Sequence, residues 1–187
     1  MSPSTRVRCV RAPAFLALLA LSACDRLAPD LSSREATSAT ELARLAPEAR
    51  RLRRLTLSGP GIDDAALAHI APLQALEALV LIDCDAAGAP GLEPLQRLRS
   101  LDELVLYDCE RLAGAALEPL AACAKLRTLR LHSKHVGAPT LEVLARCASL
   151  RSLVLTGALD EGAAPALAAL RAALPDCNVS APQEPGP

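Results

Sequence analysis

Residues 101–109 read Leu101-Asp-Glu-Leu104-Val-Leu106-Tyr-Asp-Cys109, and the first six follow the pattern L-x-x-L-x-L. The same pattern occurs five times, with first leucines separated by 24, 25, 25 and 24 residues. The five segments begin at Leu52, Leu76, Leu101, Leu126 and Leu150. Alternation of leucine with other residues is typical of a strand with one buried face. Its recurrence at a nearly fixed period predicts five equivalent strands in a repeat array.

The segments between these strands repeat as well. Leu92, Leu95 and Leu98 precede Leu101 at intervals of three residues, and the other repeats carry apolar residues at the same places. This spacing predicts a short helix with one apolar stripe. Each repeat is therefore expected to form a strand, a turn and a helix that bury their apolar faces only against neighbouring repeats. The composition agrees, since aromatic residues make up only 1% of a chain that is 51% hydrophobic.

The pattern resembles the leucine-rich repeat, L-x-x-L-x-L-x-x-N/C, and in particular its cysteine-containing subfamily. Cys84 and Cys109 occupy the ninth position of their repeats, and Cys123 and Cys147 lie shortly before a first leucine. The resemblance covers residues 40–179. It implies an α/β fold, a right-handed solenoid of about five strand–turn–helix repeats with a curved parallel sheet. Three repeats depart from the pattern and carry another residue at the ninth position: Pro60, Lys134 and Ala158.

The N-terminal segment has the composition of an export signal. Three arginines in residues 1–11 are followed by an apolar run at residues 14–21 and by Ser22-Ala23-Cys24. Leu21-Ser22-Ala23-Cys24 resembles the lipobox of bacterial lipoproteins, which implies cleavage before Cys24 and lipidation of its sulfur. Residues 1–23 are thus predicted as a lipoprotein signal peptide, and the protein as lipid-anchored to a membrane of the bacterial cell envelope. An ordinary cleaved signal, which would give a secreted protein, is the alternative.

The rest of the chain divides at changes in composition. Residues 24–39 are rich in Ser, Ala and charge without apolar periodicity, which predicts a flexible tether. Residues 40–179 are predicted to be the leucine-rich-repeat domain, with a helical half-repeat at its start and a short last strand near Val179. Residues 180–187 contain three prolines and little to pack, which predicts a disordered tail.

Strand alternation predicts which side chains are available for binding. The residues between the leucines point away from the helices, and in leucine-rich-repeat proteins they line a concave face. Valines, an isoleucine and the single tyrosine gather there on the second and third predicted strands, with charged residues around them and on the fourth strand. Such a composition is typical of a binding patch, although valine is also simply a good strand former. The predicted partner-binding residues are Val80, Ile82, Glu103, Val105, Tyr107, Asp108, Arg130 and His132.

Several kinds of chemistry find no support in the sequence. Without residues 1–23 the chain holds 17 bases and 21 acids, a net charge of −4, so no nucleic-acid partner is expected. Ser133 and His132 are adjacent on a strand and should point to opposite faces, which argues against an enzyme that uses them with Asp108. Metal-ligand spacings and a Gly-rich phosphate loop are also missing, so no metal, cofactor or small-molecule substrate is predicted.

The repeated cysteines allow two interpretations. Cys84 and Cys109 hold equivalent positions in adjacent repeats, as do Cys123 and Cys147, and adjacent strands approach within disulfide range. Their parallel side-chain directions favour buried free thiols instead.

Two functions follow from these expectations. The first is an envelope-anchored module that binds a protein or peptide through the concave face. The second is a structural protein that organises envelope components through its convex helices.

Overall fold

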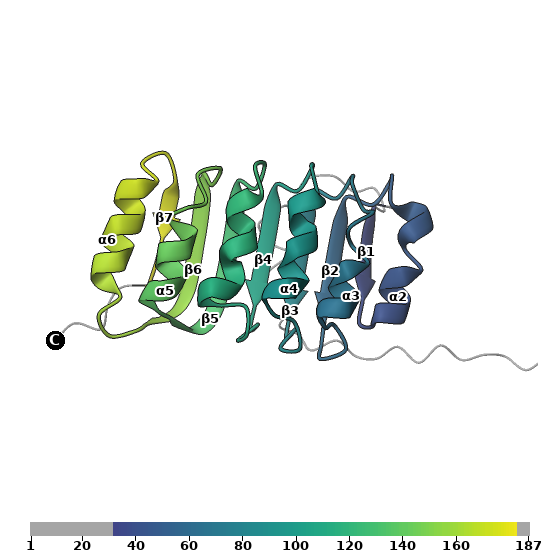
Figure 1. Ribbon diagram of the computed structural model, residues 1–187, viewed down its shortest axis with the longest axis horizontal. Coiled ribbons are helices and arrows are strands. Elements are labelled where there is room, and N and C mark those ends of the chain that lie inside the picture. Colours follow the sequence, from purple (N-terminus) through teal and green to yellow (C-terminus); the bar gives the residue numbers. More distant parts are fainter. Residues whose placement is uncertain (1–31, 183–187) are drawn as a thin grey trace, which may run out of the picture. The chain divides into compact units, whose positions relative to one another are not determined.

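The computed structural model describes residues 32–182 and is an α/β unit built around one parallel sheet (Figure 1). Seven strands lie side by side in the order of the sequence, and every neighbouring pair is parallel. This confirms the predicted α/β class and the parallel sheet. The strands are β1 Ser33–Ala36, β2 Arg54–Ser58, β3 Ala78–Ile82, β4 Glu103–Tyr107, β5 Thr128–Val136, β6 Ser152–Leu159 and β7 Asn178–Ser180.

The register of the sheet follows the sequence repeat. Leu79 pairs with Leu55 on one side and with Leu104 on the other, and the pairing continues through Leu129 to Leu153. All five side chains are buried, with at most 1% of their surface exposed. Because a slip of one residue would turn every leucine to the other face, the repeated leucines specify this register.

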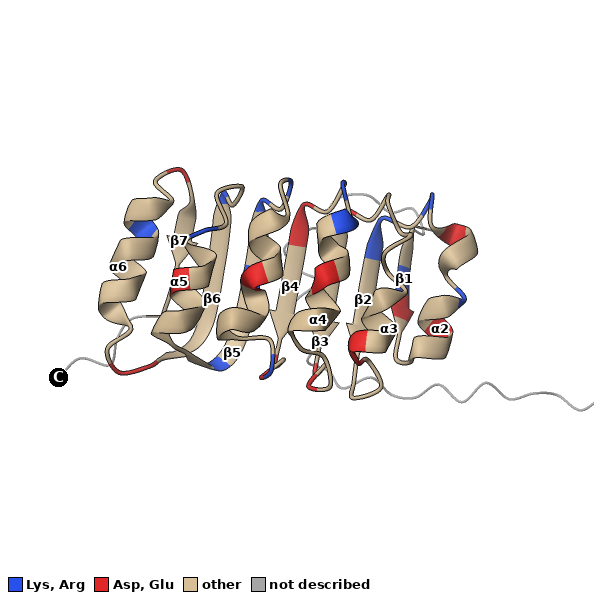
Figure 2. Ribbon diagram, viewed as in Figure 1, with Lys and Arg blue, Asp and Glu red and all other residues tan. Residues whose placement is uncertain are grey.

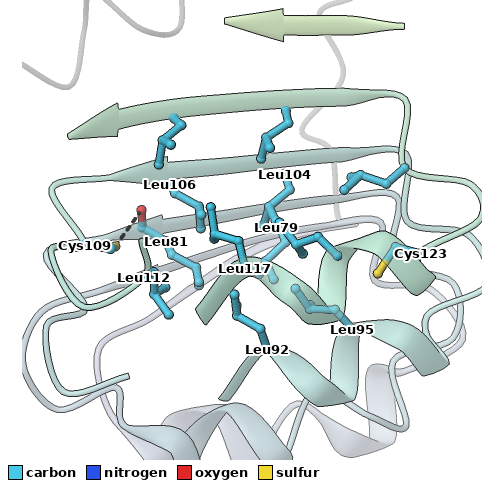
Figure 3. Packing of buried hydrophobic residues seen from close by; sticks show 14 of the residues in the cluster. Leu79, Leu81, Leu92, Leu95, Leu104, Leu106, Cys109, Leu112, Leu117 and Cys123 are labelled. Carbon is cyan, nitrogen blue, oxygen red and sulfur yellow. Dashed lines mark hydrogen bonds between the residues drawn. The ribbon is translucent and has the colours of Figure 1, made fainter. Parts of the chain in front are cut away.

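Helical segments connect successive strands and cover one face of the sheet (Figure 1). The leucines of the strands point toward the leucines of the helices and form one continuous core (Figure 3). The segments are α2 Ala39–Ala43, η1 Ala46–Glu48, α3 Asp64–Ala68, α4 Ala89–Leu92, η2 Glu93–Arg97, η3 Gly114–Ala122, α5 Ala138–Leu144 and α6 Ala164–Ala173.

Three of these segments, named η, are 3₁₀ helices rather than α-helices. A 3₁₀ helix has three residues per turn, so apolar residues spaced by three lie in line along one side. Leu117 and Leu120 are both fully buried on this side of η3, although Pro119 lies between them. The three-residue spacing in the sequence thus predicted the stripe correctly but not the helix type, since Leu141 and Leu144 have the same spacing and lie in the α-helix α5.

The predicted tether was wrong in its last seven residues. Ser33–Ala36 form β1 and pair with β2, and Ala39 already belongs to α2. Ala36 is 2% exposed and closes the first end of the core, while the pairing itself uses only main-chain groups. Because the segment is polar and has no apolar alternation, its composition did not predict the strand. The tether before residue 32, the signal peptide and Cys24 lie outside the described residues.

The predicted tail was wrong at its first residues. Ser180 belongs to β7, and Ala181 packs against the core. The short last strand was predicted correctly near Val179 and extends one residue further.

One irregularity interrupts the sheet between β5 and β6. His132 pairs with Thr156 and His135 with Ala158, so two residues of β5 face one residue of β6. The single residue is Gly157, at φ 118°, where a Cβ would overlap the carbonyl oxygen of Ser133. Only glycine fits this bulge without displacing the backbone.

Charges are segregated between the two edges at which the strands begin and end (Figure 2). The turns that lead into β2–β7, with the first residue of each strand, form what we call the basic edge. Its bases are Arg50, Arg51, Arg53, Arg54, Arg99, Lys125, Arg127, Arg146 and Arg151, and its acids are Glu77, Asp102, Glu103 and Asp176. The turns that follow β2–β6 form the acidic edge. It contains Asp63, Asp83, Asp85, Asp108, Glu110, Asp160 and Glu161, and one base, Arg111.

Candidate functional site

The face of the sheet opposite the helices carries the side chains between the leucines. On the central strands β3, β4 and β5 the register places Val80 beside Val105 and Val105 beside Arg130. Two residues along each strand, Ile82 lies beside Tyr107. Along β3 and β4 these side chains are half-buried, while the leucines that alternate with them are fully buried. The strands therefore present a partly apolar surface that is held rigidly from behind.

Tyr107, at the end of β4, and His132, in the middle of β5, form an aromatic stack. Their ring centroids lie 4.3 Å apart with an angle of 11° between the planes. The two residues are partners in the parallel register, which brings the rings face to face. His132 also lies 2.8 Å from the hydroxyl of Thr156 through Nδ1 and 3.5 Å from Asp108 through Nε2. The imidazole is thus fixed on three sides.

A second polar pair borders the patch toward the beginning of the strands. The Arg130 guanidinium lies 3.6 Å from the Glu103 carboxylate, and both side chains are partly exposed. Beyond Glu103 a hollow of about 440 Å³ extends to the basic edge, lined mainly by polar side chains such as Arg54, Asp102 and Lys125. A bound segment that covers Val105 and runs along the strand would meet charged groups both toward the beginning and toward the end of β4.

The structure places seven of the eight predicted partner-binding residues on β3, β4 and β5 and the eighth, Asp108, beside them. Asp108 follows β4 directly, with φ 50°, and faces His132. We call these eight residues and Thr156 the central patch. Thr156 was missing from the predicted set, although its place on the same face one strand further was evident from the repeat. Its contact with His132 depends on ring orientation, which the pattern of leucines does not determine.

The order of groups Thr156, His132 and Asp108 invites comparison with a catalytic triad. In such a triad the imidazole takes a proton from a hydroxyl nucleophile while the carboxylate orients the ring. Here the Thr156 hydroxyl lies 3.4 Å from the Leu131 carbonyl oxygen, to which it donates when it accepts from His132 Nδ1. A hydroxyl engaged in this way directs its proton to the Leu131 carbonyl oxygen rather than to the imidazole, and it holds the ring in position.

The repeated cysteines are free and lie in the core, except for Cys177, which is half-buried. The Cys84 thiol donates to the Ile82 carbonyl oxygen at 3.3 Å, and the Cys109 thiol donates to that of Tyr107 at 3.4 Å. Each therefore supplies a donor to a buried carbonyl group at a strand end. The neighbouring Cys109 thiol, together with burial, holds the pKa of Cys84 well above its ordinary value.

Burial alone raises the pKa of Cys123, and burial is the main cause of the raised pKa of Cys147. It raises the pKa of Cys123 to about 11, and it is the largest of the causes that raise the pKa of Cys147 to about 11. These thiols stay protonated at neutral pH and contribute to the core as small apolar groups.

Residues 32–182 contain neither a candidate metal centre nor a candidate membrane-spanning helix. Within this range no three or more His, Cys, Asp or Glu side chains are grouped so that they could hold a metal ion. No helix in the same range is long and apolar enough to cross a membrane.

No protein-family model matches the chain, and no curated protein matches it significantly.

Proposed function

We propose that the chain is an exported, lipid-anchored leucine-rich-repeat protein that binds a protein or peptide at a bacterial cell envelope. In this proposal the parallel sheet and its helices form a right-handed solenoid, and the open face of the sheet is concave. Two observations support the repeat assignment: successive L-x-x-L-x-L segments pair in register, and each is followed by a helical segment on the same face.

The central patch carries the binding part of the proposal. Val80, Val105 and Ile82 supply an apolar centre, and the stacked Tyr107 and His132 add a rigid aromatic surface. Tyrosine and arginine are enriched among residues that dominate interface energies, particularly where they are central and surrounded by polar contacts. Six spacings of about 4.8 Å between seven strands give a face about 29 Å wide, which suits an extended peptide or a small part of a folded partner.

A peptide library displayed on phage tests this assignment even though the natural ligand is unidentified. Peptides are selected on the immobilised protein, synthesised, and their affinities measured for the wild type and for Tyr107→Ala/Arg130→Ala. Truncation of two central residues of an interface removes about 1 kcal/mol or more each, so binding should weaken at least about tenfold. The matched control is Gln74→Ala/Arg97→Ala, which changes two exposed residues outside the central patch, one in the turn before β3 and one at the end of η2, and should leave the affinity unchanged.

The opposite result would contradict the proposal. Selected peptides that bind Tyr107→Ala/Arg130→Ala as tightly as the wild type, but lose affinity for the control variant, would assign binding to the helices. That outcome would support the structural role in which the convex side organises envelope components.

A further inference from the structure

We propose that the basic edge is a second interaction surface, which faces an anionic phospholipid membrane. This surface adjoins the central patch, with which it shares Glu103, but it consists of the turns at which the strands begin and of the first strand residues rather than of the open face. Nine bases and four acids gather there, against one base and seven acids on the acidic edge. The described unit is therefore strongly polarised although its net charge is small.

The bases of this edge are available to a partner. All nine are exposed, and among residues 32–182 only Arg53, Arg127 and Arg146 of the nine form ion pairs. Two of these pairs are themselves open to solvent: the Arg127 side chain is 70% exposed and that of Arg146 61%. Exposed pairs of this kind contribute little to stability, so the fold itself gives little reason for the concentration of bases.

The helix dipole favours acids at the acidic edge, whereas its effect at the opposite edge is confined to the last helical turns. Helices begin at the acidic edge, where the Asp63 carboxylate accepts a hydrogen bond from the Ala66 amide at 2.7 Å. Acids near helix N-termini are stabilising, as are bases in the last helical turn. Only Arg97 and Arg171 occupy last turns of the described helices, and neither belongs to the basic edge. The nine bases lie beyond the helix ends.

The path of the chain identifies the membrane as the partner. Ser33 pairs with Arg54, so the polypeptide enters the sheet at the basic edge. Ser33 lies nine positions after Cys24, and even fully extended this segment reaches only about 30 Å. A lipid on Cys24 would therefore keep this edge close to the headgroups. This step rests on the anchoring part of the proposed function, whereas the test below does not use the lipid.

The test measures partitioning of the unlipidated chain onto vesicles. The chain begins at residue 24 and carries Cys24→Ser; it retains the entire buried cluster, which extends from Ala36 to Leu174. Sedimentation with vesicles of phosphatidylglycerol and phosphatidylcholine is compared with vesicles of phosphatidylcholine alone. Binding is expected only to the anionic vesicles, and it should weaken as salt shortens the Debye length to about 8 Å at physiological ionic strength.

Two variants with the same change in net charge separate the edges. Arg99→Gln/Lys125→Gln removes two exposed bases of the basic edge. Arg111→Gln/Lys134→Gln removes the one arginine of the acidic edge and a lysine of β5 that lies beside this edge, where it pairs with Glu110. Each base near an anionic surface is worth about fivefold in partitioning, so the first variant should bind roughly 25-fold more weakly. The second should stay within about twofold of the parent chain.

Three results would overturn the proposal: equal losses in both variants, equal binding to both kinds of vesicle, or tighter binding to a soluble oligonucleotide than to anionic vesicles. Sedimentation of the protein without vesicles tests whether a second copy of the chain, rather than a membrane, binds the basic edge. Self-association that Arg99→Gln/Lys125→Gln weakens and Arg111→Gln/Lys134→Gln strengthens would assign the basic edge to the acidic edge of a second copy. Loss of peptide binding in the phage experiment would leave these vesicle results unaffected, so the two proposals fail independently.

Discussion

Removal of Cys123 and Cys147 should make the protein more resistant to alkali. Both thiols are buried, with 6% and 1% of the residue exposed, and burial raises their pKa from an ordinary 9.0 to about 11. The folded state thus keeps these protons at pH values at which the unfolded chain releases them. A raised folded-state pKa gives stability that is fully present below the unfolded pKa and is lost as pH rises through the folded pKa.

The size of the effect follows from the two pKa values. At pH 10 each thiol is about 90% ionised in the unfolded chain and about 10% ionised in the folded one, which removes about 1.4 kcal/mol of unfolding free energy per thiol relative to pH 7. The two thiols together remove about 2.7 kcal/mol, a large fraction of the 5–15 kcal/mol that is typical of folded proteins.

Urea unfolding followed by circular dichroism at pH 7 and pH 10, with a reductant present, measures this difference. Cys123→Ala/Cys147→Ala should be less stable than the wild type at pH 7, because atoms are removed from the core. Its further loss between pH 7 and pH 10 should be smaller than that of the wild type by about 2.7 kcal/mol. The control is Cys177→Ala, at the half-buried cysteine. An equal loss in the double variant and the wild type would refute the reasoning, since alkaline destabilisation would then come from other groups.

Three further perturbations test the fold and the anchor. Leu104→Ala should lower the free energy of unfolding by about 3 kcal/mol in urea titrations, because the side chain is fully buried between its partners on β3 and β5; a loss below about 1 kcal/mol would contradict the packing. Gly157→Ala should destabilise the protein by more than about 2 kcal/mol, since the new Cβ would meet the Ser133 carbonyl oxygen at a positive φ, whereas Gly162→Ala, which meets nothing within 4 Å, serves as the control. Cys24→Ser should move the protein from the membrane to the soluble fraction of a bacterial host, and retention in the membrane would contradict lipid anchoring at this residue.

The sequence predicted the interior of the fold better than its ends. Leucines at alternate positions have one energetically acceptable orientation, so five strands and their register could be derived from spacing alone. β1 could not, because a terminal strand pairs through its backbone and buries only Ala36 on one face. The bulge opposite Gly157 was also missed. It depends on the path of β5 to Val136, for which the leucine pattern contains no signal.

The same limit applies to the candidate site. Alternation predicted that Val105, Tyr107 and Arg130 share a face, and the structure places them there. It could not predict that the rings of Tyr107 and His132 stack or that Thr156 fixes the imidazole, because these contacts depend on side-chain torsions. The charged edges were missed for another reason. Each turn carries only a few charges, and the segregation becomes apparent only when all the turns of one edge are placed side by side.

The buried thiols bear on whether export is compatible with this core. Disulfide formation requires a thiolate that can reach its target. The raised pKa values of Cys84, Cys123 and Cys147 keep the thiolate scarce. Cys109 differs, because the neighbouring Cys84 thiol lowers its pKa, but only 3% of the residue is exposed. Protonation protects three of the thiols and burial protects the fourth, so a ladder of free cysteines can persist in an oxidising compartment for as long as the repeats stay folded.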